Sequence, residues 1–83
     1  MNNVILIFRT SVSNTEDMEH LSSVLNKCPQ IKTWSIDLED WEKVLRIECS
    51  KKLKSKDISM MLKDVDIYIS ELEYLKAEKN FNI

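Results

Sequence analysis

The chain of 83 residues contains no glycine and only one proline, Pro29. Glycine adopts a positive φ more readily than any other residue, so turns in this chain must be built from residues such as asparagine, aspartate, serine and lysine. Long hydrophobic segments are absent too, because the apolar run at residues 4–8 is too short for a signal-peptide core or a membrane span. These absences lead us to expect a cytoplasmic protein that does not bind a membrane.

Residues that usually carry catalysis or bind soft metals are scarce. His20 is the only histidine, and Cys28 and Cys49 are the only cysteines. The cysteine spacing matches neither a disulfide-rich secreted domain nor a CxxC motif, and in apolar segments a free cysteine packs as a small hydrophobe. His20 lies beside the apolar stripe of a predicted helix and is expected to face solvent. No nucleophile stands beside a base, so we expect a protein that is not an enzyme.

The formal net charge is −2 at pH 7, and acidic and basic residues are interspersed. This balance produces no strong field of one sign and gives no reason to expect nucleic acid as a partner. The lysines between Lys51 and Lys56 have no aromatic side chains among them on which bases could stack. We therefore interpret this segment as a solvated connector.

The first part of the chain predicts a strand followed by a helix. Residues 3–10 are rich in valine, isoleucine, leucine and phenylalanine without alternation, which is typical of a central strand. The helix begins at Ser13 or Asn14, either of which can cap it. Glu16 or Asp17 is the acid of the capping box, and the single proline ends the helix.

The middle of the chain predicts a β-hairpin. Apolar residues alternate with polar ones in two successive segments: Trp34, Ile36 and Leu38 in the first, and Leu45, Ile47 and Cys49 in the second. A polar turn at residues 39–42 joins the two segments, and Trp41 lies at its tip.

A second helix and a last strand complete the pattern. Ser55 is the predicted cap of the helix, and its buried stripe consists of Ile58, Met61, Leu62 and Val65. The strand runs from Ile67 to about Glu73, and residues 74–83 form a tail with little pattern.

Six elements in this order, with right-handed crossovers, predict an α+β fold. The architecture is a ferredoxin-like βαββαβ sandwich, in which a four-stranded antiparallel sheet of order 4-1-3-2 carries two helices on one face. We expect one domain over residues 1–83, with its core at about residues 3–73.

Several features recur at a recognisable spacing: Leu21 and Leu25 in the first helix, Pro29 after it, Ile31 opening a strand, and Trp-Ser-Ile-Asp-Leu at residues 34–38. This pattern resembles the heavy-metal-associated domain family of copper chaperones and metal-ATPase modules, whose strand reads Val-x-Val-Asp-Leu. The resemblance covers about residues 3–73 and implies the same ferredoxin-like fold.

The family holds its metal with a Met-x-Cys-x-x-Cys loop after the first strand. In this chain the methionine position falls on Val12, and the two cysteine positions fall on Asn14 and Asp17. A soft ion such as Cu(I) needs thiolates, which amide and carboxylate oxygens do not replace. We therefore expect no metal and no other cofactor, and we interpret the chain as a relative that has lost the family's site.

Other uses of the same loop remain open. Asn14, Glu16 and Asp17 offer oxygens to a hard cation, or they cap the helix and complement its dipole. An anion near the helix start and Arg9 is a further alternative, although two acids in the first turn oppose it. Capping is the interpretation that these residue types favour.

Cys28 and Cys49 form an alternative metal or redox site. The first ends a helix and the second ends a strand, and in the predicted topology both ends lie on the same side of the sheet. The competing interpretation is that both are core thiols packed separately.

The face of the sheet away from the helices is the candidate interaction surface. If Leu6 and Phe8 point toward the helices, Ile5 and Ile7 point away, and Val44 and Tyr68 join them. An exposed apolar patch of this kind can mark a protein interface, although β-branched residues also favour central strands for their own sake. We expect a non-enzymatic binding module that contacts a protein partner, or a second copy as a homodimer, through Ile5, Ile7, Val44 and Tyr68.

Overall fold

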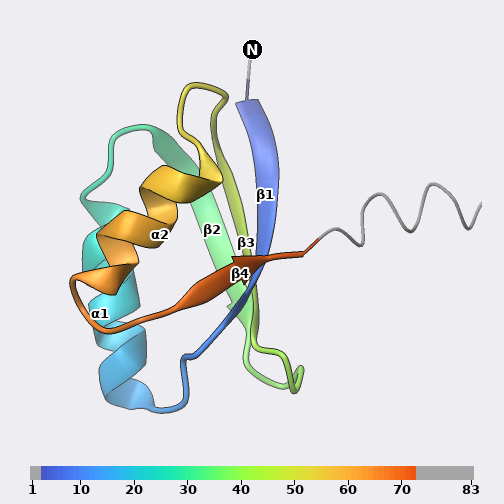
Figure 1. The fold of residues 1–83 in the computed structure, drawn as a ribbon, viewed down its shortest axis with the longest axis vertical. Coiled ribbons are helices and arrows are strands. Elements are labelled where there is room, and N and C mark those ends of the chain that lie inside the picture. The colour runs from blue at the N-terminus through green and yellow to red at the C-terminus, as the bar shows by residue number, and fades with distance from the viewer. Residues whose placement is uncertain (1–2, 73–83) are drawn as a thin grey trace, which may run out of the picture.

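The structure, a computed structural model, describes residues 3–72. The elements follow the predicted order: β1 (Asn3–Thr10), α1 (Thr15–Asn26), β2 (Ile31–Asp37), β3 (Val44–Ser50), α2 (Ser55–Lys63) and β4 (Ile69–Glu71) (Figure 1). β4 is shorter than predicted, and the predicted end of that strand at Glu73 and the tail at residues 74–83 lie outside the described residues. Within residues 3–72, no helix has the length and apolar character needed to cross a membrane.

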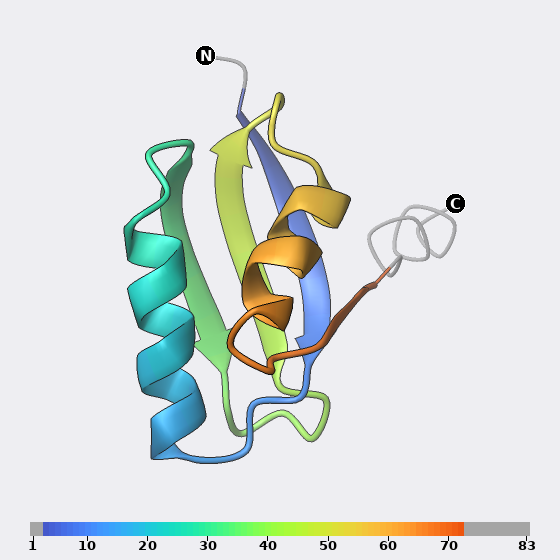
Figure 2. The same cartoon turned by 60° about the vertical axis from the view of Figure 1, so that its left-hand side comes forward.

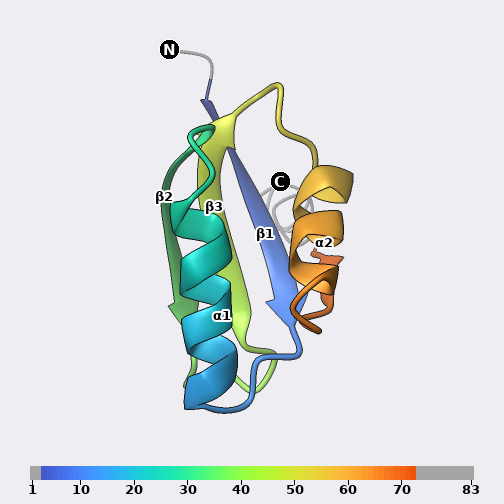
Figure 3. The same ribbon diagram turned by 90° about the vertical axis from the view of Figure 1, so that its left-hand side faces the viewer.

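The four strands form one antiparallel sheet in the order β2-β3-β1-β4, which confirms the predicted order 4-1-3-2. Both helices lie on the same face of this sheet, which we call the covered face (Figures 2 and 3). The opposite face carries Ile5, Ile7, Val44, Arg46 and Glu48, and we call it the open face. The fold is therefore the ferredoxin-like sandwich that the sequence predicts.

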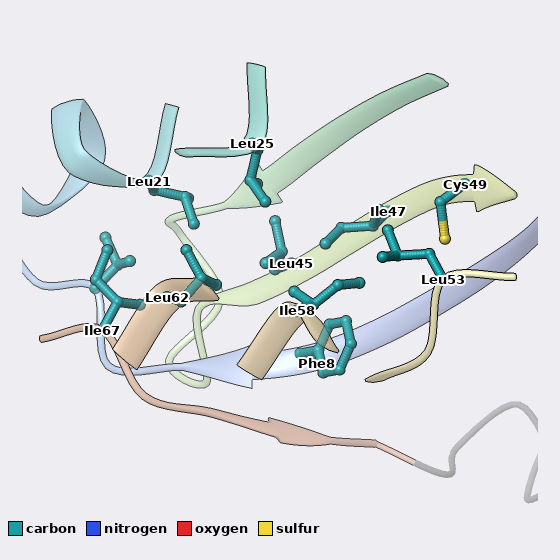
Figure 4. Close-up of a cluster of buried hydrophobic side chains, with 11 residues drawn as sticks. Phe8, Leu21, Leu25, Leu45, Ile47, Cys49, Leu53, Ile58, Leu62 and Ile67 are labelled. Carbon is teal, nitrogen blue, oxygen red and sulfur yellow. The ribbon is translucent and has the colours of Figure 1, made fainter. Parts of the chain in front are cut away.

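The core lies between the covered face and the two helices. The register pairs Phe8 with Leu45 and Leu6 with Ile47, so these side chains share one face of adjacent strands. The helices add their buried residues Leu21, Leu25, Ile58 and Leu62, and Figure 4 shows these side chains converging on β3. Burying each such side chain contributes roughly 1.5–3 kcal/mol, so this layer is the main source of stability.

The start of α2 differs from the prediction. Ser55 was expected to cap the helix, but Lys54 holds the cap position and Ser55 is the first helical residue. The carboxylate Oδ2 of Asp57 accepts the backbone N–H of Lys54 at 3.0 Å. The N–H of Asp57, which a serine side chain at the cap would accept, donates instead to the Lys54 carbonyl at 2.9 Å.

The lack of glycine has a visible cost at two turns. Lys43 and Asp66 both adopt positive φ, at 51° and 63°. Aspartate tolerates this region, but a lysine there is disfavoured by on the order of 1–2 kcal/mol. Hydrogen bonds hold the turn in place, since the Lys43 N–H donates to the Asp40 carbonyl at 2.9 Å and its carbonyl accepts the Thr10 hydroxyl at 3.0 Å.

Candidate functional site

The loop between β1 and α1 is packed into the core at its second residue. Val12, at the position of the family's methionine, is only 2% exposed and belongs to the main hydrophobic cluster. Its backbone N–H donates to the Thr10 hydroxyl at 3.3 Å. This position therefore serves packing and offers no ligand atom to the surface.

The two positions that the resemblance aligns with cysteines, Asn14 and Asp17, lie at the start of helix α1. Asn14 is the cap, and its Oδ1 accepts the backbone N–H of Asp17 at 2.8 Å. The Oδ2 of Asp17 in turn accepts the backbone N–H and the hydroxyl of Ser13, at 2.9 and 3.2 Å. Of the alternatives left open by the sequence, the cap is thus Asn14. Asp17 accepts from Ser13, the residue before the cap, and not from the cap N–H as a capping box requires. Both side chains are engaged in starting the helix.

The ligand alternatives at this loop gain no support from the geometry. No group of three or more histidine, cysteine, aspartate or glutamate side chains is placed to hold a metal ion, within the residues that the structure describes. The guanidinium of Arg9, proposed as an anion partner, lies 2.8 Å from the carboxylate of Glu42. His20 is exposed on α1, as predicted.

Cys28 and Cys49 lie at the opposite end of the sheet from this loop. Cys49 is fully buried and pairs in register with Ile31, whose backbone N–H donates to the Cys28 carbonyl at 3.1 Å. Both thiols are free, and Cys28 is half-buried. Burial, with a smaller contribution from Cys28, raises the pKa of the Cys49 thiol. Metal binding and nucleophilic attack need the thiolate, so this shift disfavours both at neutral pH.

The open face is less exposed than the sequence suggests. Ile5 is 51% exposed and Tyr68 is also exposed, but Val44 is half-buried and Ile7 is only 3% exposed. Ile7 lies on the face away from the helices, as predicted, but it is buried where an exposed patch was expected. Its neighbours explain the difference, because Arg46 lies opposite on β3 and Leu72, on the other side, donates its N–H to the Ile7 carbonyl at 2.8 Å.

Polar groups surround Ile5 on the open face. Glu48 lies opposite Ile5 in the register, and its carboxylate contacts Asn3 at 3.5 Å and Lys32 at 3.9 Å. A shallow hollow beside Ile5 is lined by Thr33, Trp34, Ser35, Arg46 and Glu48. Of the predicted apolar set, only Ile5 and Tyr68 are exposed, and Ile5 lies within a polar rim.

The apolar side chains of the hairpin between β2 and β3 are more exposed than the sequence predicts. Leu38 was predicted to continue the buried alternation of β2, but the strand ends at Asp37 and Leu38 is exposed. Trp41, at the tip, is 86% exposed. The sequence does contain a signal for this exposure. Trp41 stands among acidic residues in the turn, and no apolar neighbour within the turn can cover it.

Comparison with solved structures identifies the architecture. The chain is similar to the yeast copper transporter domain CCC2A, studied in its apo and Cu(I)-loaded states, with 10% sequence identity and a TM-score of 0.70 over 83% of this chain and 94% of that chain. It is also similar to the apo form of the HMA domain of the copper chaperone for superoxide dismutase, with 13% identity and a TM-score of 0.72 over 84% of this chain and 67% of that chain. The fold is that of a heavy-metal-associated domain.

No family model matches the sequence, and no curated protein matches it either. At identities of 10% and 13%, the likeness to heavy-metal-associated domains concerns the fold alone. What the site does must therefore be argued from its own residues.

Proposed function

We propose that this chain is a non-enzymatic interaction module in which the heavy-metal-associated fold has been kept and the metal loop has been lost. The observation that carries the proposal is the state of the three loop positions. Val12 is part of the core, while Asn14 and Asp17 hold the start of α1 through hydrogen bonds. Oxygen atoms stand where a soft ion would require sulfur.

The absence of catalytic function is part of the same proposal. The one histidine is exposed on α1, and the buried thiol of Cys49 has a raised pKa. A nucleophile needs a neighbouring base or a lowered pKa to be active at neutral pH. The two free thiols are in keeping with a reducing compartment such as the cytoplasm.

A gain of metal binding tests the loss of the loop site. The double variant Asn14→Cys and Asp17→Cys places thiols at the family's spacing, and we expect it to bind one Cu(I) ion that the unmodified chain does not hold in this loop. Ser13→Cys with Glu16→Cys is the matched control, because it adds two thiols with the same separation at shifted positions. Competition against a chromophoric Cu(I) chelator measures both. Cu(I) binding by the unmodified chain that Asp17→Ala abolishes would contradict the proposal.

For the contact surface we propose the open face, with Ile5 as its exposed apolar centre. Ile7 follows it on the same face, Val44 lies further along that face opposite Arg9, and Tyr68 is exposed directly before β4. An isoleucine half in water on a central strand gains about 1 kcal/mol or more when a partner covers it. A second copy of the chain, joined face to face as a homodimer, is the simplest occupant of this surface.

Sedimentation velocity over a concentration series tests this surface. We expect a dimer that Ile5→Lys dissociates and that Met60→Lys leaves intact, since Met60 is an exposed apolar residue on α2, away from the open face. A protein that stays monomeric at the highest concentration, and whose contacts with any partner survive Ile5→Lys, would exclude the open face as the contact surface.

A second candidate function is metal binding through Cys28 and Cys49. The observation in its favour is that the two free thiols lie at the same end of the sheet, close enough for Cys28 to affect the ionisation of Cys49. Native mass spectrometry with stoichiometric Cu(I) or Zn(II) tests it, with Cys28→Ser as the control. An unmodified chain that remains free of metal would eliminate this candidate.

A further inference from the structure

The hairpin that joins β2 and β3 presents Trp41 on a hydrogen-bonded turn. The Oδ1 of Asp37 accepts the backbone N–H groups of Glu39 and Asp40, at 3.1 and 3.3 Å. The Oδ1 of Asp40 accepts the N–H of Glu42 at 2.8 Å. The turn is further tied to β1, because the Thr10 N–H donates to the Glu42 carbonyl at 3.3 Å. The exposure of Trp41 is thus built into a hydrogen-bonded turn.

Two other exposed apolar side chains lie at the same end of the molecule. Leu38 lines a hollow between the hairpin and the start of α1, together with Met18 and Lys43. Tyr68 is held beside the end of β1, since its carbonyl accepts the Ser11 N–H and its own N–H donates to the Ser11 hydroxyl, both at 3.0 Å. We call this surface, formed by Leu38, Trp41 and Tyr68, the hairpin end; Figures 1 and 2 show the hairpin and the start of α1 together at the bottom of the molecule.

The hairpin end is surrounded by acidic side chains. The carboxylates in its loops and adjoining helix ends are those of Glu16, Asp17, Asp37, Glu39, Asp40, Glu42, Asp64 and Asp66. Basic groups are fewer here: Lys43, Lys63 and Arg9, of which Arg9 is already paired with Glu42 at 2.8 Å. The opposite end has the reverse sign, because the acids Glu48 and Asp57 are outnumbered there by lysines: Lys27, Lys32, Lys51, Lys52, Lys54 and Lys56. A net charge of −2 therefore conceals a strong separation of charge along the molecule.

We propose that the hairpin end docks a protein whose contact surface is rich in lysine and arginine, with Trp41 as the anchor that becomes buried. This inference rests on the proposed function as an interaction module and assigns it a second surface. Tryptophan is among the residues that most often dominate binding energy, and its exposure in a defined turn reduces the conformational entropy lost on binding. The acidic rim attracts a basic surface and repels nucleic acid or an anionic membrane, so charge complementarity selects the partner's chemistry.

A basic amphipathic peptide composed of lysine and leucine is the probe for this surface. In a Trp34→Phe background the emission of the chain reports Trp41 alone, and we expect it to shift to the blue as the peptide binds. Trp41→Ser should weaken binding, measured by calorimetry, by at least about tenfold. Met60→Ser, which removes an exposed apolar side chain from α2, is the matched control and should leave affinity unchanged.

Charge variants separate the two ends of the molecule. Glu39→Lys with Asp64→Lys should weaken peptide binding and flatten its dependence on salt, whereas Lys51→Glu with Lys52→Glu should not weaken it. Peptide affinity that is indifferent to Trp41→Ser and to the acidic variants would overturn the proposal.

Self-association is the competing outcome. If the chain forms oligomers at low salt that both Trp41→Ser and the Lys51→Glu, Lys52→Glu variant dissociate, the hairpin end binds a second copy and the proposed foreign partner is wrong. Ile5→Lys should not affect peptide binding. If peptide binding at the hairpin end is not observed but the contact that depends on Ile5 is, this inference is wrong and the proposed function as an interaction module is still supported.

Discussion

The two faces of the sheet use the same strand in different ways. On the covered face, Phe8 of β1 is buried by helices packed against it. On the open face, Ile7 is buried as deeply without a helix above it in the described residues, while Ile5, two positions earlier, is half exposed. The described residues on the β4 side differ between the two positions: Leu72, which directly follows β4, donates to the Ile7 carbonyl, and no described residue pairs with Ile5 on that side.

The comparison shows that burial on the open face depends on neighbouring strands, whereas burial on the covered face depends on the helices. An apolar residue in the centre of a sheet can be enclosed by the side chains opposite it, including the aliphatic part of an arginine. Predictions that weaken one face or the other test this difference.

The largest effect is expected from the covered face. Leu45→Ala should lower the free energy of unfolding by about 2–5 kcal/mol, because Leu45 is fully buried at the centre of the core and the change leaves a cavity. Urea denaturation followed by circular dichroism measures it. A loss below about 1 kcal/mol would show that the helices do not enclose β3 as described.

The next largest loss of stability is expected at the start of α1, the helix that packs on the covered face. Asn14→Ala should cost about 0.5–2 kcal/mol of stability, because the Asp17 N–H loses its acceptor. Asn14→Asp keeps a capping oxygen and should restore most of the stability. If alanine and aspartate behave alike at this position, the side chain of residue 14 does not cap the helix.

A matched pair of substitutions compares the two faces directly. Ile47→Val on the covered face and Ile7→Val on the open face should each cost about 0.5–1.5 kcal/mol, since both isoleucines are almost fully buried. Denaturation of the two variants under identical conditions provides the comparison. If only Ile7→Val leaves the free energy of unfolding unchanged, the strand neighbours enclose Ile7 less tightly than the helices enclose Ile47.

A smaller effect comes from Cys49, which lies on the covered face. Burial, and secondly Cys28, raises the pKa of its thiol above the ordinary value of 9.0. The folded protein then holds this proton more tightly than the unfolded chain, so the contribution is fully present below the unfolded pKa and is lost as pH rises toward the folded pKa. Stability should therefore decline as pH rises above the ordinary thiol value of 9.0, more steeply than in Cys49→Ala, as denaturation at several alkaline pH values would reveal. Parallel pH profiles would contradict the assignment.

The smallest effect is expected at Ile5. Ile5→Ser should change stability by no more than about 0.5 kcal/mol, because the side chain is already half in water and no described strand borders it on the β4 side. Thermal unfolding is a sufficient measurement. A loss comparable with that of Ile7→Val would show that Ile5 is covered in the folded chain.

Periodicity was sufficient to predict the six elements because the period of apolar residues changes cleanly between them. Leu45, Ile47 and Cys49 alternate and are all buried. Of the predicted helical stripe, Ile58 and Leu62 are buried, and Met61 and Val65 are half-buried. Boundaries were less certain: Ser55 proved to be inside α2 and Leu38 beyond β2. Local sequence does not fix the start of α2 or the end of β2 to the residue, because neighbouring residues can satisfy the terminal backbone groups of a helix or strand equally well.

The sequence by itself determined the order of strands and helices, the apolar side of each, and the absence of thiol ligands from the loop at Val12, Asn14 and Asp17, because these follow from residue type and spacing along the chain. Only the tertiary structure decided that Ile7 is enclosed, that Trp41 stands free at its hairpin, and that acids and lysines gather at opposite ends. Exposure and local charge depend on which distant segments lie alongside a residue, and that is a property of the folded sheet.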